Sequence, residues 1–228
     1  MKISSQFSKY ATSYDSLNSV QNLVVEKLIS LVSGKPENIL DLGCGSGALC
    51  KSVNWDYKNF TGVDFATGML DLHPKSANIQ CLYGDFNDKS LFETLASSNY
   101  DYIMSASALQ WADNLDEVFA NVKKLNAPIA LAIFTSNTFK TLNATASLDS
   151  LLKSAQEIER LADKHFHANF EVVTYKLEFE NAREMLRYIK RSGVSGSRRV
   201  LSFGETKKLM NEYPLGYLEF EVAFVTSD

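Results

Sequence analysis

The chain has 228 residues, of which 45% are hydrophobic and 22% are charged, and its formal net charge is −4 at pH 7. This composition suits one substantial core and excludes a general electrostatic attraction to nucleic acid or to an anionic membrane. The three cysteines lack metal-ligand spacing, no apolar segment approaches the roughly twenty residues that span a bilayer, and no signal peptide is recognisable. We therefore expect a reduced, cytoplasmic protein that binds neither membrane nor nucleic acid.

Hydrophobic periodicity predicts helices at the N-terminus and then strands that alternate with helices. One N-terminal helix carries Phe7, Ala11 and Tyr14 on a single face, and a second spans residues 20–32. Five short buried strands follow, at residues 38–42, 59–63, 79–83, 100–105 and 128–134. Because strands that alternate with helices form a parallel sheet covered on both faces, the pattern predicts a doubly wound α/β fold.

The alternation stops after Phe134. A polar, helix-prone stretch over residues 138–168 is interpreted as a helical insertion and a candidate substrate cap. Strands at 172–179 and 217–226, with helices at 181–192 and 204–212 between them, are expected to pair antiparallel at one edge of a seven-stranded, mostly parallel sheet. We interpret the chain as one domain with an N-terminal helical lid (1–36), a cofactor-binding core (37–135), the insertion (136–170) and C-terminal strands and helices (171–228).

The segment ILDLGCGSGAL, residues 39–49, places glycines directly after the first predicted strand. Glycines there let a ligand approach the backbone and a helix N-terminus. The spacing Gly43-x-Gly45-x-x-Ala48 also satisfies the loose dinucleotide fingerprint, so an NAD-dependent oxidoreductase is one candidate. However, a carboxylate at Asp41 would repel a pyrophosphate and attract a cationic cofactor such as S-adenosylmethionine. A tight strand-to-helix turn without a ligand is the third interpretation.

Carboxylates also follow the next two predicted strands. Asp64 ends the second strand, where a carboxylate can accept both hydroxyls of a ribose; the alternative is a cap for a helix that begins at Ala66. The Gly-Asp-Phe sequence at residues 84–86 closes the third strand, although Gly-Asp is also common in turns. Phe65 and Met69 are suited either to flank an adenosine or to belong to the core.

Several segments together resemble a known family. The glycines at 43, 45 and 47, with Asp41 two residues earlier, resemble motif I of class I S-adenosylmethionine-dependent methyltransferases. More restricted segments are F-x6-Y-D-x5-Q from Phe7 to Gln21, ALQW at 108–111, IKRSGVSGSRR at 189–199 and YPLGYLEF at 213–220. With these segments, almost the whole chain resembles the malonyl-carrier-protein O-methyltransferases of biotin synthesis.

The resemblance implies that S-adenosylmethionine methylates the free carboxylate of a malonyl thioester on an acyl-carrier protein, or on coenzyme A, and leaves as S-adenosylhomocysteine. It places the Tyr14 hydroxyl on the acceptor carboxylate, Gln21 near the methionine end of the cofactor, Asp85 on the adenine amino group and Phe86 beside the ring. Ordinary helix packing is the alternative for the stripe that holds Tyr14 and Gln21. The predicted cofactor-binding set is Gln21, Asp41, Gly43, Cys44, Gly45, Gly47, Asp64, Phe65, Met69, Asp85, Phe86 and Ser105.

The acceptor side is predicted from two regions. Gln110 and Trp111 follow the fourth strand, where this class places its acceptor, although the indole is equally suited to the core. Positive charge gathers in the C-terminal third, and part of it repeats at helical spacing from Arg183 to Arg191. Such a face either steers an acidic carrier protein or is an ordinary solvated surface. The predicted substrate-contacting set is Gln110, Trp111, Lys190, Arg191, Arg198 and Arg199.

Other functions stay open at this point. A methyltransferase of another small carboxylic acid or of a quinone differs only in its acceptor, whereas an NAD-dependent oxidoreductase and a cofactor-binding protein without catalysis belong to other classes. His165 and His167 lack companion ligands, so we expect no metal site. No G-x-S-x-G motif in a strand-turn-helix context indicates a hydrolase.

Overall fold

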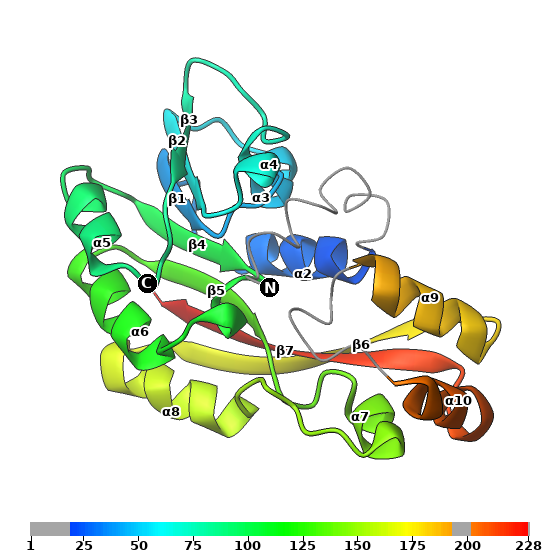
Figure 1. Ribbon diagram of the computed structural model, residues 1–228. Helices are drawn as coiled ribbons and strands as arrows, with labels where there is room; N and C mark the ends of the chain where they lie inside the picture. The colour runs from blue at the N-terminus through cyan, green and yellow to red at the C-terminus, as the bar shows by residue number, and fades with distance from the viewer. Residues whose placement is uncertain (1–18, 193–201, 228) are drawn as a thin grey trace.

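The computed structural model describes residues 19–192 and 202–227, with the side chains of 190–192 excepted, and contains one seven-stranded sheet (Figure 1). The strand order is β3-β2-β1-β4-β5-β7-β6; the first five strands are parallel, and β7 runs antiparallel to both of its neighbours. This confirms the predicted doubly wound, mostly parallel α/β fold. The strands are β1 (Asn38–Leu42), β2 (Asn59–Asp64), β3 (Ile79–Tyr83), β4 (Tyr102–Ala106), β5 (Ile129–Phe134), β6 (Asn169–Glu178) and β7 (Tyr217–Ser227).

Helices cover both faces of the sheet, and each face has its own hydrophobic cluster. In β5 the side chains of Ile129, Leu131 and Ile133 join the cluster under α5, α6 and α8, whereas Ala130, Ala132 and Phe134 join the one under α2, α3, α7, α9 and α10. The helices are α2 (Ser19–Ser30), α3 (Ala48–Ser52), α4 (Thr67–Leu70), α5 (Lys89–Leu95), η1 (Leu109–Trp111), α6 (Leu115–Lys124), α7 (Lys140–Ala146), α8 (Ala155–His165), α9 (Ala182–Ser192) and α10 (Phe203–Glu212). Within the described ranges, none is long and apolar enough to cross a membrane.

The C-terminal part confirms the antiparallel pairing of the last two strands, from Asn169 opposite Thr226 to Glu178 opposite Tyr217. The predicted insertion is helical, but its two helices lie in different places (Figure 1). α8 buries Ile158 and Leu161 beside α6 and β7, so it belongs to the helical layer of the sheet and is not part of a cap. α7 packs against α10 and β7, and a cap function for it stays a prediction.

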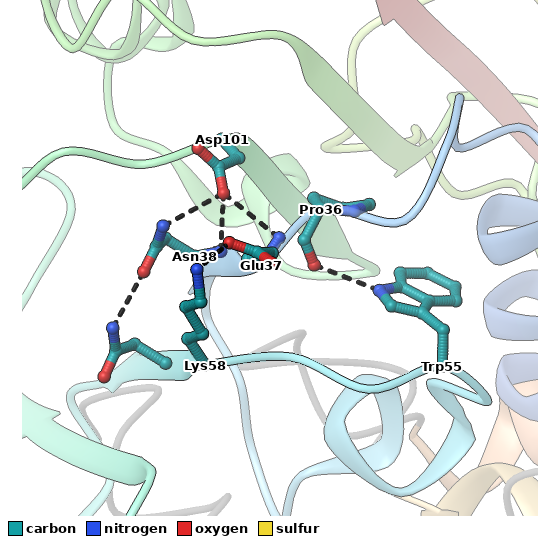
Figure 2. Close-up of polar contacts among 7 residues, drawn as sticks. Pro36, Glu37, Asn38, Trp55, Lys58 and Asp101 are labelled. Carbon is teal, nitrogen blue, oxygen red and sulfur yellow. Dashed lines mark hydrogen bonds and ion pairs between the residues drawn. The ribbon is translucent and has the colours of Figure 1, made fainter.

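The amino ends of β1 and β2 are joined by a polar network that Figure 2 shows. One carboxylate oxygen of Asp101 accepts hydrogen bonds from the backbone N–H groups of Glu37 and Asn38, at 3.0 and 2.8 Å, and from the Asn38 side-chain amide at 3.0 Å. The Asn59 amide then donates to Asn38 Oδ1 at 2.8 Å. The loop before β4 is thereby fixed to the first two strands at the edge opposite the glycine loop.

We expect Asp101→Ala to lower the free energy of unfolding by about 1–2 kcal/mol, because three hydrogen bonds to one charged acceptor are lost at a solvent-exposed site. Urea unfolding of both proteins would measure the difference. Asp101→Asn keeps one acceptor oxygen and should fall between the two. Equal unfolding midpoints for all three proteins would contradict this account.

Candidate functional site

The glycine loop lies between β1 and α3, at the carboxyl edge of the parallel strands. The N–H groups of Gly43 and Cys44 both donate to the Val63 carbonyl, at 2.8 and 3.0 Å, so the loop is fixed to the end of β2. Gly43 has φ 77°, and a Cβ placed on it would lie 2.2 Å from the Ala108 Cβ. Both the backbone conformation and the close approach of the segment after β4 therefore require glycine at this position.

A cavity opens beside this loop, at the place where open parallel sheets bind ligands. Its walls come from α2, the glycine loop, the ends of β2 and β4, and the segment that follows β3. Ten of the predicted site residues line it: Gln21, Asp41, Gly43, Cys44, Gly45, Asp64, Phe65, Met69, Phe86 and Trp111. Side chains from separate parts of the sequence are thus brought together at a single site.

The two carboxylates of the cavity differ in how they are paired. Asp64 accepts from the N–H of Gly45 at 2.9 Å and from that of Ala66 at 2.8 Å; burial raises its pKa, and these bonds oppose the rise. Asp41 is 1% exposed, and its Oδ1 atom has no hydrogen-bond partner among the described residues. Burial, followed by repulsion from Asp64, raises the pKa of Asp41 well above its ordinary value. A buried carboxylate without a partner is suited to meet a positively charged ligand group.

Two further polar atoms of the lining are buried and unpaired with any described residue. They are Gln21 Oε1, from α2, and Ser107 Oγ, from the segment after β4. Ser107 has φ 59°, in the left-handed region, and its N–H donates to the Ala132 carbonyl at 2.9 Å. Since buried polar atoms in folded proteins nearly always have partners, Gln21, Asp41 and Ser107 together indicate a polar ligand.

Comparison with known proteins agrees with this geometry. Residues 39–128 match a protein family described as "Methyltransferase domain". The malonyl-[acyl-carrier protein] O-methyltransferase of Halalkalibacterium halodurans is 30% identical over 158 residues, which cover 62% of this chain and 58% of that protein. The protein of the same name from Haemophilus influenzae is 26% identical over 234 residues, covering 95% and 85%. The matched segment runs from β1 past β4 and includes the glycine loop, so the similarity to methyltransferase domains covers most of the elements that build the cavity.

Solved structures share its fold, among them a methyltransferase. A Haemonchus contortus phosphoethanolamine N-methyltransferase 2, solved with S-adenosyl-L-methionine, superposes with a TM-score of 0.57 at 17% identity, over 96% of this chain and 56% of that one. The YcgJ protein of Bacillus subtilis superposes with a TM-score of 0.63 at 12% identity, over 90% and 97%. The chain spans about three fifths of the length of the first curated relatives it matches.

Four predicted site residues whose side chains the structure describes do not line the cavity. Gly47, with φ 83°, precedes α3 as its N-cap, and the fully buried Ser105 hydroxyl donates to the Leu42 carbonyl at 2.6 Å. Asp85 is exposed and accepts two hydrogen bonds from Asn87. This arrangement is a turn, which is the alternative interpretation of the Gly-Asp sequence. Gln110 donates to the Ser107 carbonyl at 2.6 Å. Ser105 is thus engaged in joining β4 to β1, and ligand contact by Asp85 stays a prediction.

Several predicted site residues lie outside the described ranges, and several residues that line the cavity were not predicted. Tyr14, Arg198 and Arg199 lie beyond the described ranges, as do the side chains of Lys190 and Arg191 on α9. Across the part that is described, no group of three or more histidine, cysteine or carboxylate side chains forms a metal site. The lining residues that sequence reasoning missed are Asn22, Val25, Ser46, Ala48, Leu49, Ala106, Ser107 and Ala108. Of these, Ala106 ends β4 and Ser107 and Ala108 follow it directly, so the end of that strand was the available signal.

Proposed function

We propose that the chain is an S-adenosylmethionine-dependent methyltransferase that acts on the free carboxylate of a malonyl thioester carried by an acyl-carrier protein, or by coenzyme A, early in biotin synthesis. The observation that carries the cofactor is the buried, unpaired carboxylate of Asp41 in the cavity wall. The methionine part of this cofactor has an ammonium group, and its sulfur is cationic, so its charge suits Asp41, whereas a dinucleotide pyrophosphate would be repelled. The names of the curated relatives support the acceptor.

The residues present fit the cofactor. Asp41 and Gln21 offer unpaired oxygen atoms to its methionine end, and Gly45 offers a backbone surface with nothing within 4 Å of where a Cβ would lie. Each oxygen of Asp64 already accepts one backbone hydrogen bond, which leaves further lone pairs for the ribose hydroxyls. Phe65, Met69 and Phe86 provide apolar wall for the adenine.

The proposed reaction requires little acid-base catalysis by the residues of the chain. S-Adenosylmethionine, when bound, supplies a methyl group on a positively charged sulfur. A malonyl carboxylate has a pKa of about 4, so it is ionised at neutral pH and needs no general base. The lining residues need to align the acceptor with the methyl donor and to exclude water. The buried Ser107 hydroxyl and the Trp111 indole line the cavity just after β4, where we place the acceptor.

A carrier protein needs a docking surface, and α9 offers positive charge for it. Arg183 and Arg187 are exposed, stand four residues apart and lie on the same face of that helix. Acyl-carrier proteins are acidic, so the pair would raise their association rate. The role that we assign to Arg183 and Arg187 is therefore recognition of the carrier and not chemistry.

For Tyr14→Phe we expect turnover to fall about tenfold with the affinity for S-adenosylhomocysteine unchanged, since only a hydrogen bond to the acceptor carboxylate is removed. Steady-state rates with malonyl-carrier protein and calorimetric titration would measure the two quantities. Tyr83→Phe, at an exposed tyrosine on β3, is the matched control. Unchanged turnover in Tyr14→Phe would remove Tyr14 from the acceptor site.

The proposed reaction is tested by intact mass spectrometry of malonyl-carrier protein after incubation with the purified chain and S-adenosylmethionine. A gain of one methylene on the malonyl form, absent from acetyl-carrier protein, is the expected result, because acetyl lacks a free carboxylate. No gain while S-adenosylhomocysteine still binds would keep the cofactor and overturn the acceptor.

A further inference from the structure

His73 lies beneath the glycine loop, in the turn that follows α4. The side chain is 2% exposed, and its ring lies against Phe60 of β2, with ring centroids 6.0 Å apart. It does not line the cavity, so the proposed chemistry makes no use of it. A buried imidazole this close to a ligand-binding loop nevertheless calls for a physical explanation.

Two glycines leave the space that the His73 ring fills. A Cβ on Gly47 would lie 2.9 Å from the ring Cδ2 and 3.0 Å from Nε2, and a Cβ on Gly62 would lie 3.1 Å from Nε2. Gly47 ends the loop and precedes α3, whereas Gly62 lies in the middle of β2. The imidazole therefore packs as a wedge between the loop and the sheet, beside Pro74, whose Cδ would lie 2.5 Å from a Cβ on Gly47.

The hydrogen bonds of the ring indicate which nitrogen carries a proton. Nδ1 lies 3.0 Å from the Pro74 carbonyl oxygen, and because a carbonyl only accepts, Nδ1 is the donor. Nε2 is then the bare nitrogen of a neutral ring, and it is buried with no partner in the described structure. A second proton would put a charged N–H without a partner into the space beside Gly47 and Gly62.

The surrounding groups favour the neutral ring. Burial lowers the pKa of His73, the bond to Pro74 opposes this effect, and the charge of Lys51 on α3 adds to the lowering. The Cys44 thiol lies over the same Gly62 position, and its pKa is raised first by burial and then by Asp41 and Asp64, so it stays an uncharged thiol. Cys81, the β3 neighbour of Gly62, also has its pKa raised by burial. Asp41 is the β1 neighbour of Gly62, but Nε2 makes no hydrogen bond to its carboxylate or to any other described acid group.

We propose that His73 is a positioning residue that holds the glycine loop in its cofactor-binding shape only while its ring is neutral, so that acidification weakens cofactor binding. The inference rests on the proposed cofactor. The sign follows from the lowered pKa: below the ordinary histidine value of about 6.5 the unfolded chain takes up the proton first, so the folded loop loses stability as the pH falls through this range.

The test is a proton NMR titration of the histidine rings, with and without S-adenosylhomocysteine. The chain has three histidines, at 73, 165 and 167, so His73→Gln identifies the resonance of interest and His167→Gln, at an exposed position, is the matched control. We expect His73 to titrate below about 6.5 and the ligand to lower its pKa further, because coupling between proton and ligand is reciprocal. A His73 pKa that the bound ligand does not move would overturn the proposal.

Calorimetric titration with S-adenosylhomocysteine at pH 7.5 and 5.5 gives a second measurement. The affinity of the wild-type protein should fall by about fivefold more than that of His73→Gln, whose residual fall reports the protonation of Asp41 and Asp64. Equal falls in both proteins would assign the effect to these carboxylates and overturn the role of His73.

If the ligand does not bind even at pH 7.5, the proposed cofactor fails while the wedge is still testable. His73→Ala should then increase the reaction rate of Cys44 with a thiol reagent, followed by peptide mass mapping, relative to His167→Ala. An unchanged rate would overturn the wedge itself.

Discussion

Replacing Asp41 with asparagine should weaken the binding of S-adenosylhomocysteine about 100-fold and, at the same time, raise the melting temperature of the ligand-free protein by a few degrees. Asparagine has the same shape but no charge, so the ammonium group of the ligand loses a charge-assisted partner in a buried site. Burial and Asp64 raise the pKa of Asp41, so the folded state holds its proton more tightly than the unfolded state does. Ionisation of this carboxyl in the ligand-free protein therefore lowers stability, and the substitution removes that loss.

Calorimetric titration at pH 7.5 and differential scanning calorimetry of the ligand-free proteins would measure the two effects. Asp56→Asn, at an exposed position, removes the same charge away from the cavity and should change neither quantity appreciably. Unchanged affinity in Asp41→Asn would exclude Asp41 as the cation-binding group. Loss of affinity together with a lower melting temperature would indicate a structural role for the carboxylate.

For Gly43→Ala we expect no measurable cofactor binding and a loss of roughly 3 kcal/mol or more in unfolding free energy. The new Cβ would lie 2.2 Å from the Ala108 Cβ, a distance at which one of the two segments must move. The positive φ of 77° adds backbone strain. The segment that would be displaced includes Ser107 and Trp111, which line the cavity.

Two other glycines provide matched controls for this substitution. Gly34 has a similar φ of 73° with nothing within 4 Å of its Cβ position, so Gly34→Ala reports strain alone, about 1–2 kcal/mol, with normal binding. Gly45 has equally open space but lines the cavity, so Gly45→Ala should impair binding with a similarly small loss of stability. Urea unfolding and ligand titration of all three variants would separate three effects: backbone strain, steric overlap with Ala108 and obstruction of the cavity. A Gly43→Ala protein that behaves like Gly34→Ala would contradict the close approach of Ala108.

The fold could be predicted because burial leaves a strong pattern in the sequence. The β5 residues IALAIF are buried at every position, which is why a continuous apolar run identified a central strand. The edge strand β6 alternates between half-buried and exposed residues and begins at Asn169, three residues before the predicted start. Its beginning is determined by pairing with β7, which local periodicity does not contain.

The cavity lining could be predicted where its residues lie at the carboxyl ends of strands. Glycines and carboxylates at strand ends led directly to Asp41, Gly45 and Asp64. Ser105 and Ser107 show the limit of this prediction, because the sequence does not distinguish two serines near the end of one strand. In the structure the first donates to the Leu42 carbonyl, whereas the second lies in the cavity wall. The position of His73 could not be predicted from the sequence, because Gly47 and Gly62 lie beside its ring only in the folded arrangement of β1 and β2.

The place of β7 between β5 and β6 has a consequence for how the chain is made. β6 emerges from the ribosome before β7 does, yet β7 is its only partner among the strands that the structure describes. About 40 residues separate the two strands, and at roughly 5–20 residues per second β6 waits for several seconds without a partner. Its charged residues Glu171, Lys176 and Glu178 oppose mispairing with other nascent chains during this interval.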